Sequence, residues 1–238
     1  MIGSLFESHA ASQSSGANKW GFVAIANDSR SGAGTSDTRV FPALPTTNAE
    51  ARSIAAMFQK MDSPQPVKLL LGKEGDARNV KAIWQEGIDS IHFATHGLAD
   101  LRQPIASLLL LPAPDSAGNP SYLTAGQVQE WRGNANLVYL SACETAVGPA
   151  RFADGLPGLQ RAFLRAGAHG VIATLWPVED VYAGQFASDF YRRYTAGIPA
   201  AQALSETQRA WMQPAADIRA SEIFPRRMTA WAHAFFTQ

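Results

Sequence analysis

The chain alternates between short, almost continuously apolar runs and longer segments in which apolar residues recur every three or four positions. The apolar runs lie at residues 20–26, 67–71, 90–95, 107–111, 136–141 and 170–175. Runs without polar alternation are typical of strands that are covered on both faces. The segments with helical period lie at residues 48–58, 76–84, 156–167, 181–195 and 200–212. This alternation predicts an α/β fold, a three-layer α/β/α sandwich around a mainly parallel central sheet.

Two of the predicted helices carry recognisable end signals. The helix at 48–58 starts with Asn48, a residue type that favours the N-cap, and the helix at 156–167 ends at Gly167, a typical terminator. In the helix at 181–195, Phe186, Phe190 and Tyr194 share one face at helical spacing. The nearby arginines then point elsewhere, so this cluster indicates ordinary amphipathic packing rather than a nucleic-acid surface.

The first nineteen residues look different from the rest of the chain. They are rich in serine and have no apolar period, which predicts a flexible lead-in or linker remnant over residues 1–19, outside the fold. Residues 20–238 form the predicted domain. A chain of 238 residues with 46% apolar and 17% charged side chains can bury a substantial core.

Charge and cysteine content narrow the classes of function. Twenty basic residues balance twenty acidic ones, so net charge predicts neither a nucleic-acid partner nor a membrane surface. The longest apolar runs are too short to cross a membrane and the start lacks a signal-peptide pattern, which predicts a cytoplasmic protein. The one cysteine, Cys143, excludes an internal disulfide. A single intracellular cysteine is either a small buried hydrophobe or a thiol nucleophile.

Two of the predicted strands are followed by reactive side chains. His96 and Gly97 follow the run at 90–95, and Cys143 follows the run at 136–141. In a parallel sheet both ends lie at the same edge, so these residues can meet. The imidazole can lower the pKa of the thiol or protonate a leaving amine, and the amides of Gly97 and Cys143 can form an oxyanion hole. No third catalytic residue is evident and no cofactor is expected.

A zinc site made of His92, His96 and Cys143 is the rival chemistry. The two histidines are four residues apart, as in helical zinc motifs. In a strand, however, four residues span roughly 13 Å, too far for two ligands of one ion. His92 is therefore interpreted as a core histidine, or as one that supports His96.

The sequences around both residues resemble one family. The motifs His-Phe-Ala-Thr-His96-Gly97 and Leu-Ser-Ala-Cys143-Glu-Thr are similar to those of CHAT domains, caspase-like cysteine peptidase domains often fused to tetratricopeptide repeats. The resemblance runs from about residue 20 to the C-terminus, and the 47 residues between His96 and Cys143 agree with the caspase spacing. It implies a cysteine endopeptidase that forms a thioester with a protein or peptide substrate. Glu144 follows the cysteine, where caspases have a different context, so aspartate specificity is not carried over.

The resemblance also bears on setting and selectivity. It implies activation by a partner protein or repeat domain, in bacterial defence, stress or cell-death signalling, although no repeat period occurs here. Caspase-like folds border the substrate pocket with the loops that contain Asp154, Trp176, Glu179 and Asp180. An acidic wall would select arginine or lysine. Alternatively, Glu179 and Asp180 cap the helix that follows them, and Trp176 belongs to the core.

Two other functions stay open at this point. A peptidase fold can bind partners without cutting them, as a non-catalytic interaction module. The same thiol could also serve an esterase or transferase, but the chain lacks a Gly-x-Ser-x-Gly elbow and a cofactor loop.

Overall fold

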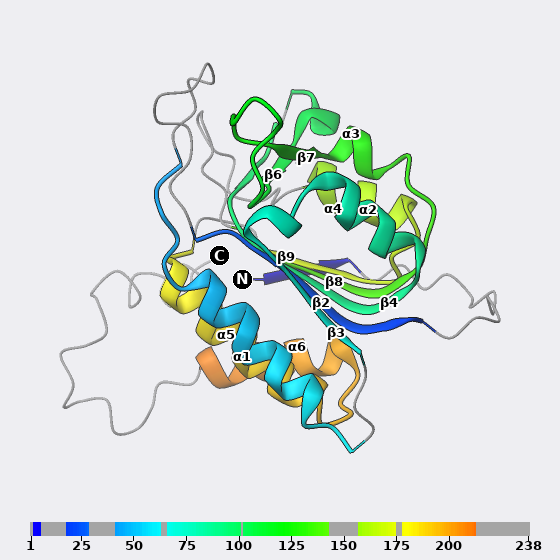
Figure 1. Cartoon of the computed structure of the whole chain (residues 1–238). Coiled ribbons are helices and arrows are strands. Elements are labelled where there is room, and N and C mark those ends of the chain that lie inside the picture. The colour runs from blue at the N-terminus through cyan, green and yellow to red at the C-terminus, as the bar shows by residue number, and fades with distance from the viewer. Residues whose placement is uncertain are drawn as a thin grey trace.

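A twisted parallel sheet forms the centre of the molecule (Figure 1). The computed structural model describes residues 2–5, 18–28, 41–62, 66–100, 102–142, 157–174 and 178–212. The sheet has the order β1-β9-β8-β4-β2-β3, in which all strands but β1 are parallel. Its strands are β1 (Ile2–Leu5), β2 (Trp20–Ala26), β3 (Val67–Leu71), β4 (Ile88–Ala94), β8 (Ala135–Ser141) and β9 (Val171–Thr174). The predicted α/β class with a mainly parallel sheet is confirmed.

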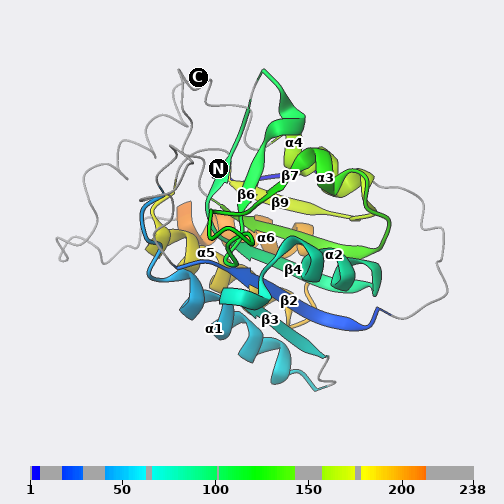
Figure 2. The same ribbon diagram turned by 45° about the horizontal axis from the view of Figure 1, so that its top comes forward.

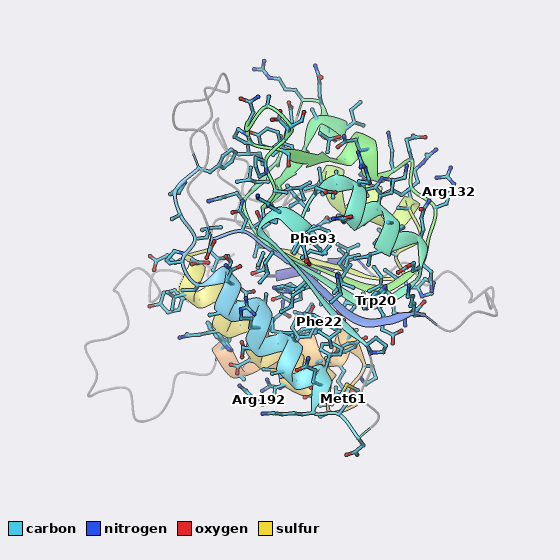
Figure 3. All side chains as sticks on the ribbon, in the orientation of Figure 1. Trp20, Phe22, Met61, Phe93, Arg132 and Arg192 are labelled. Atoms are coloured by element: carbon cyan, nitrogen blue, oxygen red, sulfur yellow. The ribbon has the colours of Figure 1, made fainter. Side chains whose placement is uncertain are left out.

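Helices cover both faces of this sheet (Figures 1 and 2). One layer contains α1 (Thr47–Gln59), α5 (Asp180–Tyr194) and α6 (Ala200–Met212), and the other contains α2 (Ala77–Gln85), α3 (Ala125–Val128) and α4 (Pro157–Arg165). Figure 3 shows Phe22 on the first side of the sheet and Phe93 on the second. Their cores differ accordingly: Phe22 packs with Phe58 and Phe190, Phe93 with Phe163 and Trp84. None of the helices in the described ranges has both the length and the apolar character needed to cross a bilayer.

A second, smaller sheet follows β4 directly. It is antiparallel and contains β5 (Gly97–Leu98), β6 (Leu108–Leu110) and β7 (Tyr122–Thr124), with the 3-10 turn η2 (Pro104–Ala106) between the first two. The apolar run at 107–111 is thus a strand, as predicted, but it does not belong to the parallel sheet. The run is continuously apolar because its residues are buried: Leu109 and Leu111 pack in the same core as α2 and α4. A continuous apolar run therefore indicates that a strand is buried, but not which sheet it joins. Another 3-10 turn, η1 (Gly72–Glu74), follows β3.

The helix ends agree with the sequence in one case and differ in another. Gly167 ends α4 in a backbone conformation with φ of 111°, and a Cβ there would lie 2.1 Å from the Gly133 carbonyl oxygen, so the predicted terminator is confirmed. Asn48, by contrast, is not the N-cap of α1. Thr46 occupies that position without a side-chain cap bond. The side-chain amide of Asn48 instead donates to the Asp28 carboxylate at 2.6 Å. The turn before the helix is closed at Thr47, whose amide and hydroxyl donate to the Leu44 carbonyl at 3.3 and 3.0 Å.

The start of the chain also differs from expectation, both at residues 2–5 and at Asn18 and Lys19, which hydrogen-bond to Asp89 and Glu86 of the domain. Residues 2–5, part of the segment predicted to lie outside the fold, form β1 and pair antiparallel with β9, from Ile2 beside Thr174 to Leu5 beside Val171. An edge strand of four residues has too short a pattern to stand out in a serine-rich segment. The rest of the division between residues 1–19 and 20–238 stays a prediction.

Candidate active site

The carboxyl ends of three neighbouring strands lie side by side at one edge of the sheet. Ala26 of β2, Ala94 of β4 and Ser141 of β8 are in register, and the amide of Thr95 donates to the Ser141 carbonyl at 3.3 Å. In the sequence, His96 follows Ala94 by two residues, and Cys143 follows Ser141 by two residues. His96 is described by the structure, whereas Cys143 lies outside the described residues.

The imidazole of His96 is held in one orientation. Its side chain is 3% exposed, and its Nε2 donates to the main-chain carbonyl of Pro42 at 2.8 Å. The Phe41 ring lies against it at a centroid distance of 5.2 Å. Because a carbonyl oxygen can only accept, Nε2 carries the hydrogen of the neutral ring. The other nitrogen, Nδ1, is then unprotonated and can accept a proton.

The surroundings of His96 also bias its charge. Burial lowers the pKa of its imidazole below the ordinary value of 6.5, and this effect is opposed by the hydrogen bond to Pro42 and by the negative charge of Asp180. The neutral ring is therefore favoured at pH 7, the form that can accept a proton from a thiol.

Gly97, the predicted oxyanion-hole donor, begins β5. The amide of Leu110 donates to the His96 carbonyl at 2.9 Å, and Gly97 faces Leu109 in the next register position. Since bonded and non-bonded pairs alternate in an antiparallel ladder, the amide of Gly97 points away from β6. β5 is the edge strand of its sheet. Among the described strands, the Gly97 amide therefore makes no hydrogen bond within this sheet.

His92 has a different role from His96. Its Nε2 lies 2.8 Å from a carboxylate oxygen of Glu50, and both side chains are almost fully buried, at 0% and 2% exposure. The rings of Phe22, Tyr139 and Tyr191 surround it. Nδ1 has no hydrogen-bond partner among the described residues. His92 is thus a core histidine, as interpreted from the sequence, and it pins α1 to β4.

The predicted pocket residues are only partly described. Asp154 and Trp176 lie outside the described residues. Glu179 is exposed and is the N-cap of α5, but its side chain makes no cap hydrogen bond. The carboxylate of Asp180 accepts from the amide of Thr46 at 3.0 Å. The two residues therefore lie where the capping interpretation put them, at the N-cap and first turn of α5. The Glu179 side chain makes no cap hydrogen bond, however, and the Asp180 carboxylate binds the start of α1.

Comparison with known proteins identifies the family of this chain. The family model described as "CHAT domain" matches residues 4–237. The chain belongs to the CHAT domain family. This family is related to caspase-like cysteine peptidases, as the sequence motifs predicted. Tetratricopeptide repeat protein 28 of Mus musculus is 39% identical over 87 residues, and that of Homo sapiens is 36% identical over 87 residues. Each match covers 37% of this chain and 4% of the relative.

Two contributors to this CHAT domain site were missed from the sequence. One is the Pro42 carbonyl, which has no sequence signal because every residue carries such a group. The other is Thr174, whose hydroxyl donates to the Ala142 carbonyl at 2.9 Å and so ties the end of β9 to the residue before Cys143. A threonine at the end of an apolar run is a weak signal, since threonine is also common in strands.

Proposed function

We propose that this CHAT domain is a cysteine endopeptidase in which Cys143 is the nucleophile and His96 its acid/base partner. The observation that carries the proposal is the buried His96 ring, fixed by the Pro42 carbonyl at a strand end that is level with the strand leading to Cys143. Ala142 is the residue next to Cys143, and its carbonyl is held by Thr174. The Cα atom of Cys143 is about 3.8 Å from that of Ala142, as in any trans peptide. Since the end of β8 lies beside the end of β4, this short step supports a short distance between the thiol and the His96 imidazole.

In the acylation step, Nδ1 of neutral His96 takes the thiol proton of Cys143 while the sulfur attacks the carbonyl carbon of the scissile bond. The carbonyl oxygen becomes an oxyanion, for which the amides of Gly97 and Cys143 are the proposed donors. As this intermediate collapses, the C–N bond breaks and the imidazolium gives its proton to the departing amine. The Pro42 carbonyl stabilises the imidazolium because it accepts from Nε2 throughout.

In the deacylation step, His96 takes a proton from water, and the resulting hydroxide attacks the thioester. The C–S bond breaks, the carboxylic acid product leaves, and the proton on His96 returns to the Cys143 thiolate. The cycle needs no cofactor, and each proton that the ring accepts is released again.

The substrate and setting belong to the same proposal. We propose a protein or peptide substrate and activation by a partner protein or repeat domain, since both matched relatives are named for tetratricopeptide repeats. A cytoplasmic role in bacterial defence, stress or cell-death signalling is carried over from the family resemblance. An acidic pocket that selects arginine or lysine would draw on Asp154 and Glu179, with Trp176 as a wall, rather than on Asp180, whose carboxylate is engaged by Thr46.

Active-site labelling tests the proposal. The wild type, alone and with the products of neighbouring genes, is treated with a library of peptidyl acyloxymethyl ketones, and adducts are located by mass spectrometry. We expect an adduct on Cys143, none in Cys143→Ala, and about 10²- to 10⁴-fold slower labelling in His96→Ala. His169→Ala is the matched control, since His169 is exposed. If the wild type neither labels nor cleaves under any of these conditions, the endopeptidase proposal is wrong.

A non-catalytic interaction module is the second candidate. The names of the matched relatives favour it, because they describe repeat proteins rather than peptidases. This candidate predicts that Cys143→Ala binds the same partners as the wild type and that no partner is cut by either protein.

A further inference from the structure

The loop that carries Pro42 needs an anchor, because the carbonyl must stay within hydrogen-bond distance of His96. This segment, residues 41–46, contacts the His96 ring through Phe41 and Pro42 and ends at Thr46, the N-cap of α1. It contains no charged side chain. The buried Phe41 ring also lies against Tyr122, and the Leu44 carbonyl accepts from the hydroxyl of Thr47. The end of the segment, where α1 begins, has one further contact that comes from a distant element.

That contact comes from α5. The Asp180 carboxylate accepts from the Thr46 amide at 3.0 Å, from 134 residues further along the chain. Amides at a helix N-terminus have no partner within the helix, and a carboxylate there is favoured by the helix dipole. We propose that Asp180 is a positioning residue for His96, because it holds the start of α1 and thereby the Pro42 carbonyl against the ring. The inference rests on the proposed function.

The two helices are in close contact one turn further on as well. α1 and α5 run side by side across one face of the sheet (Figures 1 and 2). A Cβ added to Gly184 of α5 would lie 3.2 Å from a carboxylate oxygen of Glu50 in α1, so the backbones pack closely there. Glu50 is in turn bound to His92 of β4. The start of α1 is thus held from α5 at Thr46 and from the sheet at Glu50.

Asp180 also acts on His96 through its charge. Among the described residues, Asp28 follows β2, Asp100 follows β5, and Glu179 and Asp180 lie at the start of α5. Asp28 is bound to the Asn48 amide, and Asp180 is the group among them whose charge raises the pKa of His96. A negative charge here stabilises the imidazolium that forms during catalysis, without a direct contact with the substrate.

Substitutions at Asp180 separate the anchor from the charge. In Asp180→Asn, the amide oxygen can still accept from Thr46, but the charge is gone, whereas Asp180→Ala removes both. Glu179→Gln is the matched control, since it removes the same charge one residue away from an exposed side chain without a cap bond. The pKa of His96 is measured by NMR titration of its ring in the full chain, with the signal assigned by its loss in His96→Ala.

We expect Asp180→Asn to lower the His96 pKa while the Nε2–H tautomer is kept, and Glu179→Gln to leave both unchanged. Asp180→Ala should also lower the pKa and, in addition, release the ring, seen as mixed tautomers in the nitrogen shifts and loss of the Nε2–H signal. Near-ultraviolet circular dichroism checks that each variant is folded. The proposal is overturned if Asp180→Ala retains a single tautomer, or if Glu179→Gln shifts the pKa as much as Asp180→Asn.

These readouts do not depend on cleavage. If the wild type fails to label but the titrations behave as expected, the endopeptidase proposal fails and the positioning role of Asp180 stands. If labelling succeeds and the titrations do not respond, the reverse holds. Where labelling succeeds, its rate against pH should move to lower pH in Asp180→Asn relative to the wild type.

Discussion

Two histidines in the same strand segment serve different purposes, and their partners explain the difference. His92 is bound to a buried carboxylate in the middle of the sheet, whereas His96 is bound to a main-chain carbonyl at its edge. The sequence distinguishes the two by their distance from the strand end. It does not predict either partner, because Glu50 lies on another element and the Pro42 carbonyl has no sequence signal.

Loss of the Glu50 carboxylate should destabilise the protein. In Glu50→Ala the Nε2 of His92, which is fully buried, loses its partner, and we expect the free energy of unfolding to fall by about 1–3 kcal/mol. Urea unfolding measures this. Glu74→Ala is the control, because the Glu74 side chain is 63% exposed and its contact with Lys68 spans 3.8 Å, so its loss should cost less than about 1 kcal/mol. Equal losses in the two variants would contradict the structural role of the pair.

The charge state of His96 makes stability depend on pH. Because burial lowers the pKa of His96 in the folded protein, the unfolded chain binds more protons between the folded pKa and about 6.5. The free energy of unfolding should therefore fall as the pH drops through this interval. We expect the loss between pH 7 and pH 5 to be smaller in His96→Gln and unchanged in His169→Gln, as measured by urea unfolding at each pH. If His96→Gln loses as much stability as the wild type, the lowered pKa of His96 does not drive the effect.

At the scale of elements, the ends of β8 and β9 are joined by a hydrogen bond just before Cys143, the proposed nucleophile. Thr174 of β9 is 6% exposed, and its hydroxyl binds the carbonyl of Ala142 after β8. Such a contact orients the chain where β8 ends, because it fixes the last carbonyl before Cys143.

Thr174→Val keeps the shape of the side chain and removes this hydrogen bond. We expect the free energy of unfolding to fall by about 1 kcal/mol or somewhat more, since the Ala142 carbonyl loses a buried donor. Labelling of Cys143 should also slow relative to Thr174→Ser, which retains the hydroxyl. Chemical unfolding and adduct formation measure the two effects. If the valine and serine variants behave alike, the hydroxyl does not support the site.

Helix termination provides another test at this scale. Gly167 after α4 and Gly197 after α5 both have positive φ, 111° and 88°, but of these two only Gly167 has a main-chain oxygen in the place of a Cβ. Gly197→Ala should cost about 1–2 kcal/mol from backbone strain. Gly167→Ala should cost clearly more, because the main chain of Gly133, just before β8, must also shift. Thermal unfolding compares them, at about 2–4 °C per kcal/mol for a chain of this size. A larger loss at Gly197 would contradict this explanation.

Across the whole molecule, the pattern of apolar residues was sufficient for the fold class and for most elements. Within the described ranges it located five of the six strands of the central sheet and five of the six α-helices, since each has a long period or run. It missed β1, β5, β7 and α3, which contain two to four residues each. So short an element takes its structure from neighbours: α3, for instance, is fixed by a capping box between Thr124 and Gln127.

The pairing of strands and the contacts between distant segments could not be predicted from the pattern of apolar residues. The run at 107–111 has the composition of a central strand, yet it pairs in the small sheet that follows β4. Which strand a segment pairs with depends on the return path of the chain, and apolar content reports only burial. Likewise, the contact between Asp180 and Thr46 joins positions 134 residues apart, and no local signal encodes it.

The use of a main-chain carbonyl to hold His96 reverses, for the proposed peptidase, the usual dependence of an active site on side-chain identity. At most active sites the identity of a side chain is fixed, while the length of the surrounding loop is tolerant. In this protein any residue at position 42 supplies the same oxygen, but a deletion between Pro42 and Thr46 would move it by about 3.5 Å, more than a hydrogen bond tolerates. Substitution scanning would pass over this position without effect, whereas scanning by single-residue deletion would identify it as essential.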